Sequence, residues 1–196
     1  MTTRTGTRAP AAATAAEAPE TPEAPETPEA PETPEVPEDQ VKGLHRKFVT
    51  GVTIVTTMDG DRPRGLAVNA FSSISLSPPL VMVCVQRTSS TYEPLFRSRH
   101  MGISILAADQ LPVASVFATK SSDKFAELRW TPAAHGSPLI DHSSATLEAR
   151  IEERLQTTTH TIFVGRVVEA AHSDRPPLIY SAGGFYDGGR LDQAAS

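Results

Sequence analysis

Apolar and polar residues alternate along much of the chain beyond residue 40, a pattern typical of strands with one buried face. This pattern predicts strands at 52–58, 103–106, 145–158, 161–171 and 178–180. The segment 65–85 predicts two more strands, joined at a rigid corner formed by its two consecutive prolines. The first of these two strands alternates, with small polar residues on one side, and the second is apolar almost throughout.

Short helices are predicted between the strands. Apolar residues at helical spacing predict a helix over 39–48. The hydroxyl side chains of 89–91 predict the capped start of a second helix, because they can satisfy free amides of the first turn. Asp109 is expected to cap a third helix in the same way.

The remaining patterns concern one irregular segment and one strand. Residues 120–144 are expected to be irregular, with Phe125 and Trp130 as anchors. In the strand 145–158, apolar residues alternate with a predicted solvated face made of Glu148, Arg150 and Glu152. Strands in hairpin-like succession with short inserted helices predict a mainly β fold, a β-barrel rather than a βαβ sheet.

The N-terminal segment differs in composition from the rest. Residues 18–35 are three copies of Ala-Pro-Glu-Thr-Pro-Glu, which cannot bury enough apolar surface to offset the entropy of ordering. We therefore expect residues 1–39 to be a disordered tail, 40–188 to be the folded domain and 189–196 to be a flexible end.

The charge and hydropathy of the chain limit the classes of partner that it can bind. The tail carries nine acidic and two basic residues, which accounts for more than the whole net charge of −5. The folded part is therefore close to neutral, which gives no sign of a nucleic-acid partner. We expect no membrane partner, because no apolar run reaches the roughly 18 residues of a membrane span and no signal peptide is evident. A cytoplasmic location is the expectation.

Catalytic and metal motifs are missing from the sequence. It has no Gly-x-Ser-x-Gly elbow, Walker loop or Gly-x-Gly-x-x-Gly that opens a helix. The six histidines are scattered and Cys84 is the only cysteine, so we expect no metal site. We expect Cys84 to be a small buried hydrophobe. If the protein is an enzyme, the chemistry belongs to a cofactor and no catalytic side chain is nominated.

Two segments fit a flavin, although each also has a structural interpretation that stays open. The segment 65–71 offers small side chains and Asn69, but it could be an ordinary core strand. Residues 89–91 could hold a phosphate or only cap a helix. Arg87 could complement the phosphate charge or could be a solvated strand end.

Several motifs occur in one order along the chain. They are Phe48-x-Thr50-Gly51-Val52-Thr53-Ile54-Val55-Thr56-Thr57, Gly65-x-Ala67-x-Asn69-x-Phe71-x-Ser73-x-Ser75-Leu76-x-Pro78-Pro79-Leu80-Val81, Ser90-x-Tyr92, Ile103-Ser104-Ile105-Leu106-Ala107-x-Asp109-Gln110, Asp123-Lys124-Phe125, Gly136-Ser137-Pro138-Leu139-Ile140, His160-Thr161-Ile162-Phe163-Val164-Gly165-x-Val167 and Pro177-Leu178-Ile179-Tyr180-x-x-Gly183. Over about residues 41–186 this set resembles the flavin reductase family, the small reductase component of two-component flavin monooxygenases.

The resemblance implies a homodimeric FMN-binding split barrel of Greek-key type. It implies NAD(P)H-dependent reduction of free or loosely bound FMN or FAD, with NADH or NADPH as donor, for a separate flavin-dependent monooxygenase. The implied flavin-binding residues are Pro63, Arg64, Gly65, Leu66, Ala67, Asn69, Ala70, Cys84, Val85, Gln86, Ser90, Thr91 and Phe117. The implied nicotinamide-binding residues are His160, Tyr180, Ser181, Ala182 and Gly183. The alternative is a non-catalytic split barrel that carries flavin or haem.

The chain departs from the family pattern at two positions. Many relatives have an acidic residue directly before the histidine that matches His160, whereas this chain has Thr159. Relatives often place Arg or Lys before the phenylalanine that matches Phe117, whereas this chain has Val116. One cationic contact to the flavin phosphate is therefore expected to be missing.

Overall fold

The structure is a computed structural model of the 196-residue chain that describes residues 35–119 and 123–192. Most of the predicted tail and the last four residues lie outside the described part, so the predicted domain boundaries stay predictions. All described residues except Glu35 belong to one compact unit. The elements are α1 (Glu38–His45), β1 (Thr50–Gly51), β2 (Thr53–Asp59), β3 (Arg62–Val68), β4 (Phe71–Leu76), β5 (Pro79–Gln86), α2 (Tyr92–Arg97), β6 (His100–Ile105), α3 (Leu111–Ala118), β7 (Trp130–Pro132), β8 (Pro138–Ile140), β9 (Ala145–Gln156), β10 (His160–His172), β11 (Leu178–Ser181), β12 (Gly184–Asp187) and the 3-10 helix η1 (Gly188–Arg190).

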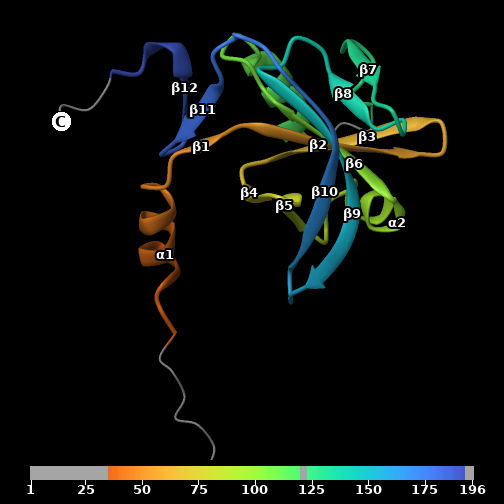
Figure 1. Cartoon of the computed structure of the whole chain (residues 1–196). Coiled ribbons are helices and arrows are strands. Elements are labelled where there is room, and N and C mark those ends of the chain that lie inside the picture. The colour runs from red at the N-terminus through yellow and green to blue at the C-terminus, as the bar shows by residue number, and fades with distance from the viewer. Residues whose placement is uncertain (1–34, 120–122, 193–196) are drawn as a thin grey trace, which may run out of the picture. The chain divides into compact units, whose positions relative to one another are not determined.

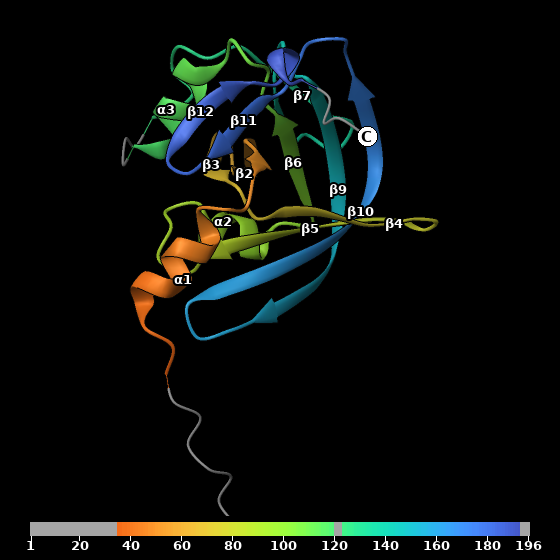
Figure 2. The same cartoon turned by 90° about the vertical axis from the view of Figure 1, so that its left-hand side faces the viewer.

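Seven antiparallel strands form the main sheet, in the order β3-β2-β6-β9-β10-β5-β4. β3 and β4 are its two edges, yet only Asn69 and Ala70 separate them along the chain. Because an extended chain spans at most about 3.6 Å per residue, the two edges must lie close together. The backbone N–H of Cys84 on β5 donates to the Ala70 carbonyl at 3.0 Å. The sheet therefore curls into a barrel that is split between β3 and β4 (Figures 1 and 2), which confirms the predicted mainly β barrel.

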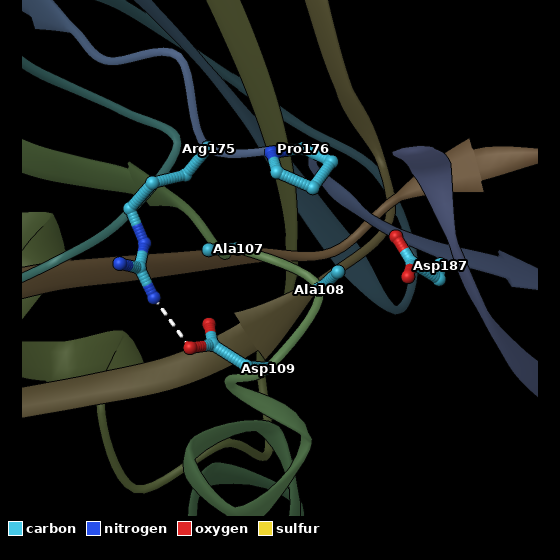
Figure 3. Close-up of a pocket in the computed structure, with 6 residues that line it drawn as sticks. All are labelled: Ala107, Ala108, Asp109, Arg175, Pro176 and Asp187. Carbon is cyan, nitrogen blue, oxygen red and sulfur yellow. Dashed lines mark hydrogen bonds and ion pairs between the residues drawn. The ribbon is translucent and has the colours of Figure 1, made fainter. Parts of the chain in front are cut away.

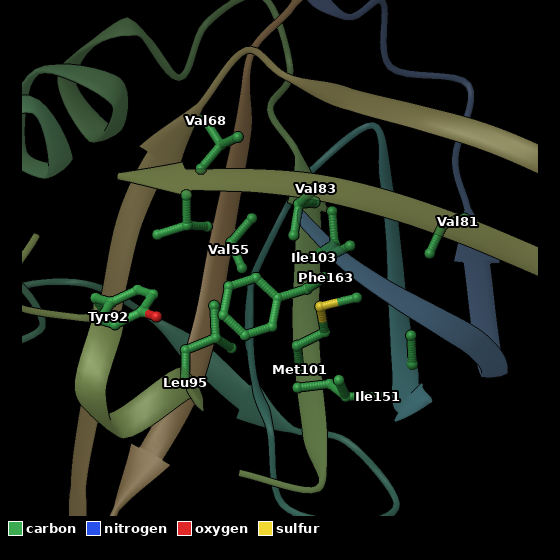
Figure 4. Close-up of a cluster of buried hydrophobic side chains, with 12 residues drawn as sticks. Val55, Val68, Val81, Val83, Tyr92, Leu95, Met101, Ile103, Ile151 and Phe163 are labelled. Atoms are coloured by element: carbon green, nitrogen blue, oxygen red, sulfur yellow. The ribbon is translucent and has the colours of Figure 1, made fainter. Parts of the chain in front are cut away.

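Apolar side chains fill the inside of the barrel. Along β5, Val81, Val83 and Val85 are buried, because alternate residues of a strand face the same side. Phe163 from β10 lies among them, and Tyr92 from α2 packs edge-on against its ring, with the centroids 6.3 Å apart (Figure 4). Each fully buried side chain of this kind contributes about 1.5–3 kcal/mol of transfer free energy, so this cluster is a main source of stability.

A second apolar cluster lies against the other face of β2. Val55 on this strand belongs to the barrel core, whereas its neighbour Ile54 belongs to the second cluster. Phe117 from α3 and Phe125 cover Ile54 from outside the barrel. The cluster connects the barrel to a three-stranded sheet, in the order β1-β11-β12, because Leu178 on β11 also belongs to it. β12 follows the predicted last strand and was not predicted.

The segment 65–85 contains three strands rather than the two predicted. β3 ends at Val68, and a new strand, β4, begins at Phe71 on the opposite edge of the sheet. The sequence pattern misses this break because alternation continues through it. The two prolines do form the corner, between β4 and β5, and the Ser77–Pro78 peptide bond is cis.

The hydroxyl and carboxylate side chains do not cap the first turns of α2 and α3 as predicted, although both helices begin close to the expected positions. At α2 only the Ser89 hydroxyl meets a nearby amide, the Thr91 N–H at 3.3 Å. The Thr91 hydroxyl donates to the Gly65 carbonyl at 2.9 Å rather than capping α2, and so ties α2 to β3. Asp109 forms an ion pair with Arg175 in a cavity of ≈ 380 Å³ (Figure 3) and does not cap α3. In both cases the polar side chain bonds to a partner that is distant in sequence.

The predicted irregular segment 120–144 contains a small hairpin, formed by β7 and β8. Phe125 is buried and packs edge-on against Trp130, with ring centroids 6.2 Å apart, so both anchors are confirmed. The solvated face predicted for β9 is wrong at Glu148, which is 0% exposed beneath this hairpin. Its carboxylate accepts hydrogen bonds from the backbone N–H groups of His135, at 2.8 Å, and Ser137, at 3.0 Å.

No helix in the described part of the chain is long and apolar enough to cross a membrane.

Candidate functional site

A cavity of ≈ 1060 Å³ opens at the split of the barrel. Its walls come from β3, the link to β4, β5, the loop before α2, the end of α3 and the start of β10. This volume is at the upper end of the roughly 300–1,000 Å³ typical of small-molecule sites. The lining residues are Leu66, Ala67, Val68, Asn69, Ala70, Cys84, Gln86, Thr88, Ser89, Ser90, Phe117, Ala118, Thr119, Lys124 and His160.

Most of the residues predicted to bind flavin line this cavity, although they come from distant parts of the chain. They are Leu66, Ala67, Asn69, Ala70, Cys84, Gln86, Ser90 and Phe117. Arg87, considered as a phosphate partner, is exposed and does not line the cavity. The split between β3 and β4 brings the other residues together, because it places the link 69–70 directly beside β5.

The other predicted flavin residues lie elsewhere. Pro63, Arg64, Gly65 and Thr91 line a second, very small cavity, which shares Ser90 and Lys124 with the large one. Its volume of ≈ 10 Å³ has room for about one water molecule. The side chain of Val85 points into the barrel core, where it is 1% exposed.

Cys84 is half-buried and lines the large cavity, so the expectation of a buried core residue is corrected. The reason is strand alternation, since Val83 and Val85 on either side of it occupy the barrel core. Burial raises the pKa of the Cys84 thiol above its ordinary value. The thiol is therefore neutral at neutral pH and acts as a small apolar part of the wall.

Gly65 allows the Phe117 ring to lie against β3. A Cβ atom at position 65 would lie 2.7 Å from Cε1 of Phe117 and 3.2 Å from Cζ of Phe125. Both distances are shorter than ordinary van der Waals contact. The glycine therefore positions the aromatic wall of the cavity, although Gly65 itself does not line it.

His160 enters the cavity at the first residue of β10, where it pairs with Gln86 of β5. Its Nδ1 lies 2.8 Å from the Thr159 hydroxyl. Thr159, where the family pattern predicted an acidic residue, supplies a polar contact to the ring. This contact fixes the orientation of the imidazole at the cavity wall.

The other predicted nicotinamide residues do not line the large cavity. Tyr180 packs against the second apolar cluster, which also contains Phe117. Ser181 ends β11, and the turn to β12 has positive φ angles at Ala182 (53°) and Gly183 (91°). The structure thus joins His160, but not the segment 180–183, to the predicted flavin residues.

Lys124 is the main residue of the cavity that the sequence analysis missed. Its Nζ donates to the Phe117 carbonyl at 2.9 Å, at the end of α3. Burial lowers the pKa of the Lys124 ammonium below its ordinary value. The motif Asp123-Lys124-Phe125 was part of the resemblance, but nothing in the sequence shows that α3 and this motif meet. Thr88 and Thr119 were also missed, whereas Ser89 belongs to the segment 89–91 that the sequence offers as a phosphate contact.

The arrangement fits a flavin better than a catalytic side-chain pair. Small and apolar side chains, such as Ala67 and Phe117, can face a planar ring, and the amides of Asn69 and Gln86 can bond its polar edge. Hydroxyls of the loop before α2 and the ammonium group of Lys124, from the segment after α3, suit a phosphate. The part of the chain that the structure describes holds no group of His, Cys, Asp and Glu able to bind a metal ion.

Comparison with known proteins assigns the family. Residues 44–189 match the flavin reductase like domain. The chain belongs to the flavin reductase family. It is 39% identical over 138 residues to the FMN reductase (NADH) SmoA of Agrobacterium fabrum, a match that covers 70% of this chain and 79% of that protein. Among solved structures, the NADH:FAD oxidoreductase SgcE6 of Streptomyces globisporus, in complex with NAD and FAD fragments, has a TM-score of 0.73 and 36% identity. That likeness covers 81% of this chain and 94% of SgcE6.

Another relative is longer than this chain. The reductase component of the flavin-dependent trigonelline monooxygenase of Acinetobacter baylyi is 36% identical over 140 residues. The match covers 71% of this chain but only 45% of that protein, so the chain spans less than half of its length.

Proposed function

We propose that this protein transfers a hydride from NADH or NADPH to FMN or FAD and supplies the reduced flavin to a separate flavin-dependent monooxygenase. The observation that carries the proposal is the cavity at the barrel split. It gathers residues from β3, β5, α3 and β10 that the family resemblance assigns to flavin and nicotinamide. Bound flavin supplies the redox chemistry, because it accepts a hydride from the nicotinamide ring.

The side chains bind and orient in this proposal. Asn69 and Gln86 hold the polar edge of the flavin ring, and the aromatic wall formed by Phe117 excludes water from one side. His160, fixed by Thr159, contacts the nicotinamide side. No acid or base is required, since hydride transfer depends on the close approach of two bound rings. The turn 181–183 is proposed to reach the dinucleotide outside the cavity.

The proposed partner is supported by the names of relatives, which include reductase components of monooxygenases. We also propose a homodimer, supported by apolar side chains that the unit leaves exposed. A cytoplasmic location fits a reductase that draws on the NADH and NADPH of the cell. The partner oxygenase and its substrate are not indicated by any described residue.

A direct assay tests the proposed reaction. The purified chain is mixed with FMN or FAD and with NADH or NADPH, and loss of reduced nicotinamide is followed by its absorbance under anaerobic conditions. We expect oxidation that needs both protein and flavin, with matching bleaching of the flavin. Binding of flavin without oxidation of either donor would favour a carrier protein instead.

A further inference from the structure

Lys124 is a cation on the wall that the two cavities share. It lines the large cavity together with Ser89 and Ser90, and it lines the small one together with Arg64 and Thr91. The hydrogen bond to the Phe117 carbonyl uses one of the three donors of its ammonium group. The nitrogen also lies 5.9 Å from the centroid of the Phe117 ring, which keeps it next to the aromatic wall.

The charge of Lys124 has no carboxylate partner among the described residues. The described ion pairs involve other cations, and the backbone carbonyl at the end of α3 offers only a partial negative charge. Burial also opposes this charge, which is why the pKa of Lys124 is lowered. A half-buried cation of this kind is stabilised by an anion that enters the cavity.

Arg64 is the other cation near this position, but it is less suited to touch a ligand. Its Nε pairs with Asp59 at 3.6 Å, so its charge is already partly balanced. It borders only the small cavity, whose ≈ 10 Å³ is far too small for a phosphate group. A phosphate therefore fits only on the side of the large cavity.

Hydroxyl groups complete the anion site beside Lys124. Ser90 is exposed, and its hydroxyl has no hydrogen-bond partner among the described residues. The Thr91 hydroxyl, by contrast, is committed to the Gly65 carbonyl. Ser89 and Ser90 thus remain as donors on the cavity side, close to a cation that is fixed by α3.

We propose that Lys124 binds the flavin phosphate. The proposal rests on the proposed function, since it assumes that flavin is the ligand. The phosphate lies between the Lys124 ammonium and the hydroxyls of Ser89 and Ser90. Val116, next to Phe117, carries no charge, so Lys124 supplies the cation at this wall of the cavity.

Binding measurements with FMN, FAD and riboflavin test this proposal, because riboflavin has the same ring but no phosphate. We expect Lys124→Met to weaken binding of FMN and FAD by about ten- to a hundredfold, the usual effect of losing a charge-assisted hydrogen bond. Binding of riboflavin stays unchanged, and Lys124→Arg retains most of the FMN affinity. Lys47→Met, at an exposed lysine outside the cavity, is the matched control.

Each outcome bears on the proposal. Equal losses of affinity for riboflavin and FMN, or no loss in Lys124→Met, would overturn the proposal. A loss only in Arg64→Met would assign the phosphate to Arg64.

If Lys124→Met does not fold, the unmodified chain decides. It must bind FMN more tightly than riboflavin, and added salt must reduce that difference. A phosphate preference without NADH or NADPH oxidation would reject the proposed reaction and leave the Lys124 site standing. Absence of all flavin binding would reject both.

Discussion

Among single residues, Glu148 is fully buried although the alternation of the strand predicts that it is solvated. Arg150 and Glu152, next on the same side of the alternation, are exposed as predicted. The loop between β7 and β8 supplies backbone donors to the Glu148 carboxylate, from His135 and Ser137. Burial would raise the pKa of Glu148, but hydrogen bonds from Ser137 and His135 outweigh it and lower the pKa. A periodic pattern cannot show this, because the covering loop comes from an irregular segment.

Replacing Glu148 by Gln should therefore destabilise the fold. The amide nitrogen of Gln cannot accept a hydrogen bond, so a buried backbone N–H loses its partner, at a cost of about 1–3 kcal/mol. Urea unfolding of Glu148→Gln measures this cost. Glu152→Gln is the matched control, since Glu152 lies on the exposed face of the same strand, where it pairs with Arg166. Equal stability of the two variants would contradict the structural role of Glu148.

His100 makes the stability of this region depend on pH. Its ring stacks on His135 at 4.1 Å, and Glu148, Arg150 and Arg99 also face it. Burial lowers the pKa of His100, and the nearby positive charges lower it further, against the opposing effect of Glu148.

As pH falls below about 6.5, the unfolded chain therefore takes up a proton at position 100 before the folded protein does, and stability decreases. We expect the melting temperature to decrease when the pH is lowered from 7.5 to 5.5, and to decrease less in His100→Gln. An equal fall in both proteins would exclude His100 as the source. Glu148, whose pKa is also lowered, loses its stabilising contribution only at lower pH, below the ordinary value of 4.5.

At the scale of elements, the sequence predicts most strands but not the break inside 65–76. Small and polar residues alternate on both sides of Asn69, so β3 and β4 look like one strand, although they lie at opposite edges of the sheet. The caps predicted at Thr91 and Asp109 are wrong, because both side chains have partners far along the chain. Local patterns show which residues are extended; they do not show which neighbour satisfies a polar group.

The close contact between β3 and α3 gives a prediction for Gly65. Gly65→Ala places a methyl group against the Phe117 ring, whose nearest carbon would be 2.7 Å away, and so pushes the ring toward the cavity. We expect a loss of about 1–3 kcal/mol in stability from overpacking, together with weaker flavin binding. Gly51→Ala is the control, because a Cβ atom there has nothing within 4 Å. Thermal unfolding and flavin titration of both variants measure the two effects. Unchanged flavin affinity in a folded Gly65→Ala would show that this contact does not shape the cavity.

At the scale of the whole molecule, the barrel was predictable because two signals agree: the succession of strands along the chain and the resemblance to the flavin reductase family. The site was predictable only in part. Residues close together in sequence, such as Asn69 and Ala70, could be assigned from one motif. Lys124 could not, since its place beside Ser90 depends on how α3 and the following segment pack against the barrel. Contacts between separate elements decide the chemistry at this position.

The exposed apolar residues of the folded unit lead to the last prediction, that the chain is a dimer in solution. α1 has no buried residue, and an isolated helix needs about 12–15 residues to be stable in water, so its eight residues need a covering surface. Leu44 on α1 and Phe48 after it are 68% and 71% exposed, and Leu76 at the tip of the β4–β5 hairpin is 89% exposed.

Analytical ultracentrifugation should give twice the 21.0 kDa mass of the chain. The double variant Leu44→Glu, Phe48→Glu should shift it toward monomer, and Leu76→Glu, measured separately, shows whether the hairpin shares the interface. A monomer across the micromolar range in the unmodified chain would contradict the prediction and leave α1 without a partner of its own kind.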